Sequence, residues 1–207
     1  MIIHGHPFSS YCQKVIIAFY ETGAPFDFKL IENAADFEAL KKLWPFGLMP
    51  VLVDGPTTVV ESSIIIDYAT PSLIPDDDLE VRFLDRFFDN YVMTPMQKVV
   101  IDRLRPEAER DARGVTDARA RLQTSYAWLE GRLEGRHWAA GGEAFTLADC
   151  AAAPSLFYAD WTERIGAQFP TLRAYRARPL AHPSVKRAVD EARPYRAGFP
   201  LGAPDRD

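Results

Sequence analysis

Residues 6–15 read HPFSSYCQKV and follow a short apolar opening, MIIHG. The opening is typical of a β-strand, and the apolar residues after Tyr11 recur at helical spacing. Ser9 and Ser10 are therefore predicted at a strand-to-helix turn, where unpaired backbone N–H groups carry partial positive charge. Such a turn stabilises an anion, either a phosphate or a thiolate. A hydroxyl aimed at a sulfur lowers the pKa of its thiol. An ordinary helix N-cap is the alternative for either serine.

The first 70 residues or so alternate β-type and helical runs. A helix is expected to end at Gly23, which is suited to a left-handed C-terminal conformation. VLVDGPTTVVES predicts a hairpin around residues 54–56. The sequence favours strands at MIIHGH, FDFKLIE, MPVLVDG and TTVVES. This order predicts a mixed sheet with helices packed against it.

Strand patterns disappear beyond the proline- and aspartate-rich stretch PSLIPDDDLE at 71–80. Apolar residues then recur at three- and four-residue steps, as expected for long helices. One of these helices is predicted to start at FTLADC, with Thr146 as N-cap, Asp149 as its reciprocal partner, and Phe145 and Cys150 as a hydrophobic staple. We therefore predict an α/β domain at 1–72, a linker at 73–80 and an all-helical domain at 81–207.

Composition excludes several classes of protein. The 207 residues carry a net charge of −5, so no nucleic-acid partner is expected. Neither a signal peptide nor a bilayer-spanning run is predicted, and we expect a cytoplasmic protein without membrane association. Cys12 and Cys150 lie too far apart for a disulfide framework or a zinc site. No metal is expected.

Two further motifs point to a peptide ligand. In LMPVLVDG, Pro50 suits the first position of a strand, and a cis Met49–Pro50 bond would expose the backbone of Val51 to an added extended peptide. In VESSIIIDY, Glu61 and Ser62 precede an apolar helical run whose start offers N–H donors to a carboxylate. Glu61 is also able to pair with an ammonium group. An ordinary N-cap at Ser62 or Ser63 is the alternative.

In this order and spacing, the three motifs resemble the cytosolic glutathione transferase family over essentially all 207 residues. The resemblance implies a thioredoxin-like domain with a four-stranded mixed sheet, followed by a helical domain. In that family the catalytic hydroxyl lies six residues before the valine of a [K/R]-V pair. Lys14-Val15 is that pair here, so the resemblance favours Ser9 over Ser10 and indicates a bacterial, serine-type member.

The resemblance also implies how glutathione is held as co-substrate. The cis-proline would lie in the segment Met49, Pro50 and Val51, and the backbone of this segment would pair with the cysteinyl part of glutathione. Glu61 and Ser62 would hold the γ-glutamyl end. Phe8 would line the pocket beside the sulfur.

Two residues depart from the family pattern before the third strand. Trp44 replaces an asparagine, and Leu48 stands where a lysine or glutamine often meets the glycyl carboxylate. Lys41 or Lys42 is the candidate substitute. Weak glutathione binding is therefore expected.

The reading that the sequence favours is a homodimeric, detoxifying glutathione transferase, which adds the glutathione sulfur to a small hydrophobic electrophile. The second pocket is expected between the domains, with candidates Phe88, Tyr91, Val92, Met96 and Gln97. One alternative is a glutathione-dependent redox or ether-cleaving enzyme, in which Cys12 would be a redox group. The other is a non-catalytic binding module on the same scaffold.

Overall fold

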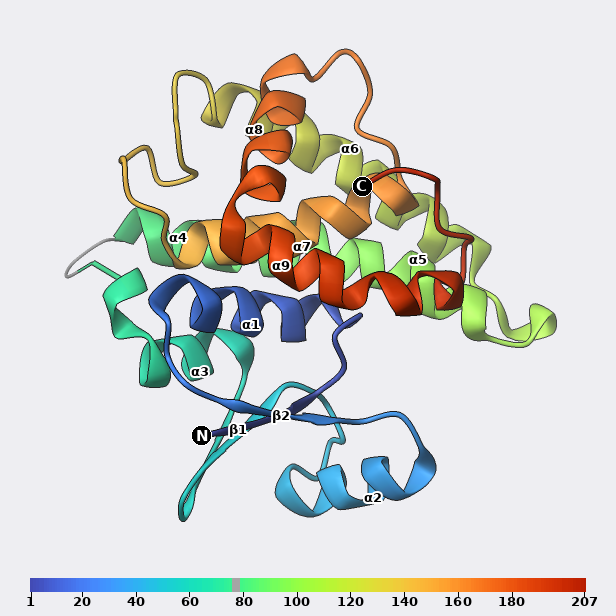
Figure 1. The fold of residues 1–207 in the computed structure, drawn as a ribbon. Coiled ribbons are helices and arrows are strands. Elements are labelled where there is room, and N and C mark those ends of the chain that lie inside the picture. The colour runs from blue at the N-terminus through green and yellow to red at the C-terminus, as the bar shows by residue number, and fades with distance from the viewer. Residues whose placement is uncertain (76–78) are drawn as a thin grey trace.

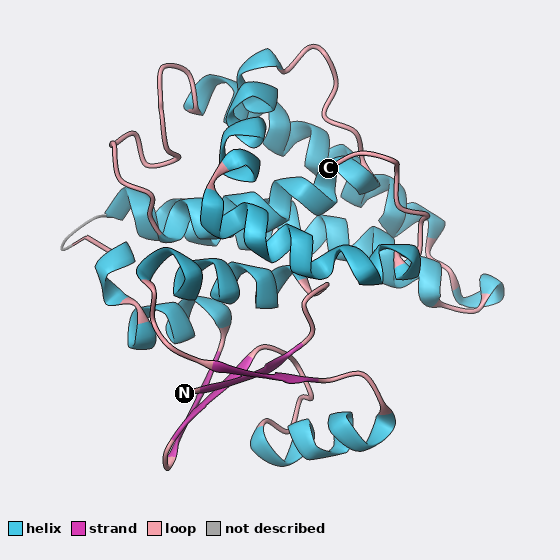
Figure 2. Ribbon diagram, in the orientation of Figure 1, coloured by secondary structure: helices cyan, strands magenta, loops and turns pink. Residues whose placement is uncertain are grey.

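The computed structural model describes residues 1–75 and 79–207. Its sheet has the order β2-β1-β3-β4, with β1 parallel to β2 and β3 antiparallel to both of its neighbours (Figure 2). The predicted four-stranded mixed sheet is confirmed. The strands are β1 (Ile2–Gly5), β2 (Asp27–Leu30), β3 (Val51–Asp54) and β4 (Thr57–Val60).

Helices cover the sheet on both faces. α1 (Ser10–Thr22) and α3 (Ser62–Ala69) lie on the side of the helical domain, and α2 (Ala34–Leu43) lies on the other side (Figure 1). α1 ends as expected at Gly23, whose φ is 69°. α1 also approaches β1 very closely, because a Cβ added to Gly5 would lie 2.6 Å from the Cys12 sulfur. Only glycine fits at that strand position.

The second half of the chain is helical, as predicted. α7 is buried along its whole length and begins with the predicted capping box of Thr146 and Asp149. The predicted linker at 73–80 includes residues 76–78, which lie outside the described residues. The longer helices are α4 (Leu79–Phe87), α5 (Thr94–Leu104), α6 (Ala112–Arg132), α7 (Leu147–Thr162), α8 (Pro170–Ala181) and α9 (Pro183–Ala192). Short 3-10 turns are η1 (Pro71–Leu73), η3 (Glu107–Glu109) and η4 (Arg193–Gly198).

A π-helical turn, η2 (Phe88–Met93), joins α4 to α5. Pro95 explains the irregularity, because it has no N–H to donate to the carbonyl of Tyr91 one turn earlier. The hydroxyl of Ser125 on α6 donates to that carbonyl instead, at 2.7 Å. The hydroxyl of Thr94 donates to the carbonyl of Asp89 at 2.9 Å. The two hydroxyl groups thus provide donors to backbone carbonyls of the π-helical turn.

The two domains share one hydrophobic core, in which α1 packs against α7 and α9. None of the helices in the described ranges has both the length and the apolar character that crossing a bilayer requires. Those ranges also contain no group of three His, Cys, Asp or Glu side chains placed to bind a metal ion.

Candidate functional site

The sheet register brings the three predicted motifs to one end of the sheet. His4 at the end of β1 pairs with Val51 at the start of β3, and Val51 pairs with Val60 at the end of β4. The segments that follow β1, precede β3 and follow β4 must therefore lie together. Helices α1 and α3 both begin at this same end, so their partial positive charges reinforce each other there.

Ser9 is the N-cap of α1. Its Oγ accepts the N–H of Cys12 at 3.5 Å, and this contact uses an oxygen lone pair rather than the hydroxyl proton. The preceding turn is held by His6, whose carbonyl accepts the Ser9 N–H at 2.9 Å and whose Nδ1 accepts the Phe8 N–H at 3.1 Å. Capping and donation to a ligand are compatible, because they use the lone pair and the proton of one hydroxyl. Ser10 is buried beside it.

The Met49–Pro50 peptide bond is cis. Val51 has a paired strand residue on each side, His4 and Val60, so the ladder already uses its backbone groups. The expectation of free backbone groups at Val51 is therefore wrong. Met49 lies just outside the strand, and it makes no backbone hydrogen bond within residues 1–75 and 79–207. The donor and acceptor open to an extended ligand belong to Met49.

Glu61 and Ser62 form the start of α3. Glu61 is exposed and has a φ of 69°. Among the described residues, no other non-glycine residue has a positive φ. Such a conformation costs about 1–3 kcal/mol and tends to persist at ligand sites. Glu61 makes no side-chain cap bond, so the first N–H groups of α3 are open to a carboxylate. Ser62 is buried at this helix start.

A buried ion cluster contacts the start of α3. The ammonium group of Lys14 is completely buried and lies 2.5 Å from an Asp85 carboxylate oxygen and 2.8 Å from one of Asp89. It also donates to the Ser63 hydroxyl at 2.9 Å. Lys14 belongs to α1, whereas both aspartates belong to the helical domain. The cluster therefore ties the helical domain to the α3 turn. Burial raises the pKa of Asp89, and the charge of Lys14 opposes that shift.

A cavity of about 190 Å³ opens beside Ser9, between the domains. Two of the five residues proposed for the second pocket, Met96 and Gln97, line it. Phe88 and Val92 are buried in the core instead. Tyr91 is exposed and lies against Phe87, with ring centroids 5.2 Å apart. The other lining residues are Phe8, Ser9, Ser10, Val100, Ile101, Tyr158, Gly198, Phe199 and Pro200.

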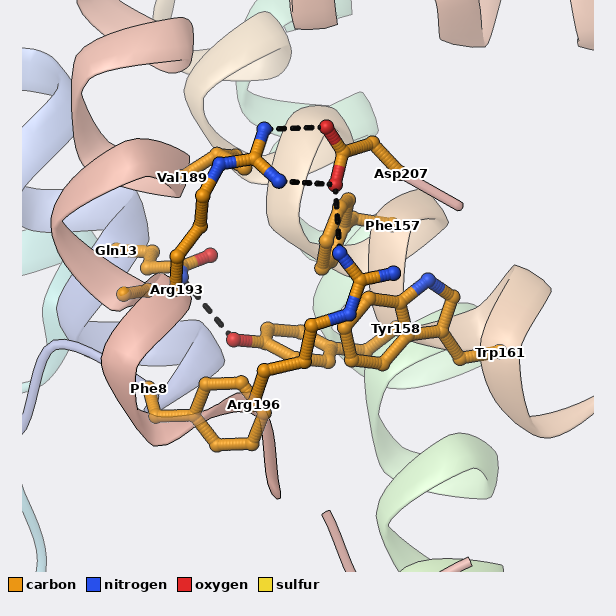
Figure 3. Close-up of a pocket in the computed structure, with 10 residues that line it drawn as sticks. Phe8, Gln13, Phe157, Tyr158, Trp161, Val189, Arg193, Arg196 and Asp207 are labelled. Carbon is orange, nitrogen blue, oxygen red and sulfur yellow. Dashed lines mark hydrogen bonds and ion pairs between the residues drawn. The ribbon is translucent and has the colours of Figure 1, made fainter. Parts of the chain in front are cut away.

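The sequence did not reveal that Tyr158 and the C-terminal segment contribute to this cavity. Tyr158 packs edge-on against Phe8 at 5.3 Å, and its hydroxyl accepts a bond of 3.0 Å from Gln13 (Figure 3). Phe199 lies within 6.4 Å of Phe8, ring to ring. The irregular composition of the C-terminal segment gave no sign of this contact, because it joins residues almost 200 positions apart in the chain.

The structure disfavours a redox role for Cys12. The side chain is fully buried, and burial raises the pKa of its thiol to about 11, while the hydrogen bond with Ser9 opposes the shift. Cys150 is also buried, and burial raises the pKa of its thiol. Both groups are therefore protonated and inaccessible at neutral pH.

The loop before β3 carries two exposed apolar side chains. Leu48 is 61 % exposed and Phe46 is 72 % exposed. Lys41, one candidate substitute, already donates to Glu38 at 2.8 Å. Lys42 is exposed on the same helix.

The fold is that of a thioredoxin-like domain joined to a helical domain, and the convergent helix starts mark a candidate ligand site at their junction. The family model of the glutathione S-transferase N-terminal domain matches residues 3–71, and that of the C-terminal domain matches residues 64–183. The chain belongs to the glutathione S-transferase family.

Similar proteins agree with this assignment. A glutathione S-transferase of Methylobacillus flagellatus, solved with GSH bound, is 25% identical with a TM-score of 0.81, covering 90% of this chain and 98% of its own. One of Methylobacterium radiotolerans, in complex with glutathione sulfonate, is 27% identical with a TM-score of 0.78, covering 91% and 93%. The stringent starvation protein A homolog of Haemophilus influenzae is 24% identical, and the match covers 89% of this chain and 87% of that protein.

Proposed function

We propose that this protein is a serine-type glutathione transferase that conjugates glutathione to a small hydrophobic electrophile. The main support is the placement of Ser9 at the α1 start, in the wall of the interdomain cavity. The hydroxyl, the uncapped α3 start and the Met49 backbone lie at one end of the sheet. Together they suit an extended peptide that carries a thiol and a carboxylate.

Each part of glutathione has a proposed partner. The γ-glutamyl carboxylate would accept N–H groups at the start of α3, and its ammonium would pair with Glu61. The cysteinyl backbone would pair with Met49, as an added strand does. Its sulfur would accept the Ser9 proton in a hydrogen bond, with Phe8 beside it.

The chemistry needs no protein base. The glutathione thiol releases its proton to solvent, and Ser9 with the α1 start stabilises the resulting thiolate. The sulfur lone pair then forms a bond to the electrophilic carbon. Either a leaving group departs with its bonding electrons, or an activated double bond takes up the electrons and then a proton from water. Catalysis consists of thiolate stabilisation and proximity.

Calorimetric titration with reduced glutathione tests the binding. Wild type is expected to bind weakly, because Leu48 offers no charge to the glycyl carboxylate. Leu48→Lys should lower the Kd about twofold to fivefold, less than a buried ion pair would give because the position is exposed. Phe46→Lys, which adds the same charge two residues away, is the matched control and should leave Kd unchanged. Absence of heat in all three proteins would rule out glutathione as the ligand.

A non-catalytic binding module is the second candidate. The exposed apolar pair Phe46 and Leu48 at the ligand end of the sheet favours it, as does the likeness to the stringent starvation protein A homolog. In that case, glutathione would produce no heat in the titration, and Ser9→Ala would change no activity.

We also propose that the chain forms a homodimer. Both domains carry exposed aromatic and aliphatic side chains near their junction, on α3 and on the helices that follow it, namely Ile64, Tyr68, Phe83, Tyr91 and Trp128. An ion pair of 3.8 Å between Asp67 on α3 and Arg82 on α4 shows that these two helices adjoin. A second copy would bury these groups. Light scattering of the purified protein is expected to give twice the chain mass, and a monomer mass at micromolar concentration would contradict the proposal.

A further inference from the structure

A second, arginine-rich cavity lies in the helical domain between the end of α7 and the start of α8. Its volume is about 500 Å³, which falls within the range of small-molecule sites. α8 lies on the side of the helical domain away from the sheet (Figure 1), so this cavity is separate from the proposed glutathione site. Its charged lining residues are Asp160, Arg164, Arg173, Arg176, Arg206 and Asp207.

Positive charge exceeds negative charge in this cavity. Four arginines against two aspartates leave a charge of +2, in a chain whose net charge is −5. Asp160 is shared, since one of its carboxylate oxygens lies 3.2 Å from Arg206 and 3.6 Å from Arg176. Its other carboxylate oxygen accepts the N–H of Ile165 at 2.8 Å. Asp160 therefore cannot neutralise the remaining arginines.

The other carboxylate, that of Asp207, is directed elsewhere. Figure 3 shows it facing the guanidinium groups of Arg193 and Arg196, to which its nearest oxygens lie at 2.5 and 3.3 Å. Arg176 reaches only the backbone carbonyl of Asp207, at 3.2 Å. The Asp207 charge is thus already matched outside the cavity.

Two guanidinium groups on the cavity wall, those of Arg164 and Arg173, are exposed. Within residues 1–75 and 79–207, neither of these side chains makes a hydrogen bond or an ion pair. Arg173 and Arg176 lie one turn apart on α8, where like charges repel each other. The guanidinium group of Arg176 is already engaged, because its Nη2 atom lies 3.6 Å from Asp160 and its Nε and Nη1 atoms donate to the carbonyls of Leu156 and Asp207 at 3.3 and 3.2 Å. Arg176 therefore adds positive charge to the cavity wall but offers no free donor.

We propose that this cavity binds a phosphorylated small molecule, with Arg164 and Arg173 holding its phosphate oxygens. Guanidinium groups match phosphate geometry and bond it in pairs, which suits two arginines on the wall of one cavity. Ile165 and Ala174 on the cavity wall would contact the uncharged part of the ligand. The volume exceeds that of a bare inorganic anion, which favours an organic phosphate.

Binding of inorganic pyrophosphate, measured by calorimetry and thermal shift, tests the charged part of this site. Wild type is expected to bind with saturation, and Arg164→Gln and Arg173→Gln should each weaken binding about tenfold, as loss of a charge-assisted hydrogen bond does. Neither side chain has a partner among the residues that the structure describes, so both variants should fold normally. Arg121→Gln, at an exposed position on α6, is the matched control and should bind like wild type.

A response equal to that of sodium chloride at the same ionic strength would overturn the proposal, as would unchanged binding in both variants. A panel of mononucleotides and sugar phosphates then tests the organic part, and affinity above that of pyrophosphate is expected for at least one class. Tighter binding of an oligonucleotide than of any small phosphate would also contradict the proposal. Glutathione titration of the same variants should match wild type, so this inference and the proposed function fail independently.

Discussion

Ser9→Ala is expected to lower glutathione-conjugating activity at pH 7 by about 10- to 100-fold. The variant loses one hydrogen bond to a charged sulfur, which contributes about 1.5–3 kcal/mol, equivalent to about one to two pKa units of the thiol. The pKa of bound glutathione should rise by that amount, so the rate should recover as pH increases. The pH profile of kcat/KM with a chromogenic aryl halide measures the shift directly.

The capping role of Ser9 has to be separated from this effect. Loss of the N-cap costs about 1 kcal/mol with alanine but only a few tenths with glycine. Ser9→Gly should therefore be as inactive as Ser9→Ala while retaining more stability. Ser10→Ala is the matched control and should keep activity within about twofold, since a residue without a catalytic role contributes little to the barrier. The reverse result, an inactive Ser10→Ala with an active Ser9→Ala, would show that Ser10 and not Ser9 provides the hydroxyl that stabilises the thiolate.

Lys14→Met is expected to produce the largest loss of stability. The substitution preserves the apolar stem but leaves Asp85 buried without its cation and Asp89 with only the exposed Arg86 at 3.3 Å among the described residues. Removal of one partner from a buried ion pair costs about 3–5 kcal/mol, which corresponds to roughly 6–20 °C in melting temperature for a chain of this size. Chemical denaturation and calorimetry measure the two quantities. The α3 turn should also loosen, because Ser63 loses its donor.

The deficit of Lys14→Met should depend on pH in a defined direction. Without Lys14, the main charge that opposes the burial-driven rise in the pKa of Asp89 is lost, and the more exposed Arg86 remains at 3.3 Å. When the pKa of a carboxyl group is higher in the folded than in the unfolded protein, its contribution to stability is fully present below the unfolded pKa. That stability is lost as pH rises through the folded pKa. The variant should therefore lose more stability at neutral pH than near pH 4.

Controls for Lys14→Met come from an exposed pair and from charge removal. Lys98→Met breaks the pair with Asp111, which has a distance of 2.6 Å but is partly exposed, and should cost less than about 1 kcal/mol. Adding Asp85→Asn and Asp89→Asn to Lys14→Met removes the unpaired charges and should restore part of the stability. Equal stability of wild type and Lys14→Met would show that the buried cluster does not hold the domains together.

Much of the fold could be read from local patterns. The strand runs, the helix end at Gly23 and the capping box at Thr146 were all predicted, and the structure confirms them. These features depend on residues within one or two turns of each other, so composition and spacing specify them. The turn at Ser9 was equally visible, although its two roles, helix cap and hydroxyl donor, could not be separated from the sequence.

Features that depend on distant contacts could not be read in this way. The open backbone groups belong to Met49 because Val51 pairs with strands on both sides, a fact of register that no local pattern contains. Lys14 was noted only as half of a sequence pair, but its aspartate partners lie more than 70 positions away. Its complete burial is possible only because the helical domain supplies those charges.

The chain's own pattern thus specified its secondary structure, its two-part organisation and the helix starts that carry partial positive charge, since each arises from neighbouring residues. Packing between the domains determined which side chains share the cavity with Ser9. It selected Met96 and Gln97 from five candidates and added Tyr158 and Phe199. Packing also placed the side chains of Arg164 and Arg173 on the wall of a second cavity, without partners among residues 1–75 and 79–207. The physical reason is that burial and charge balance depend on what folding brings from elsewhere in the chain.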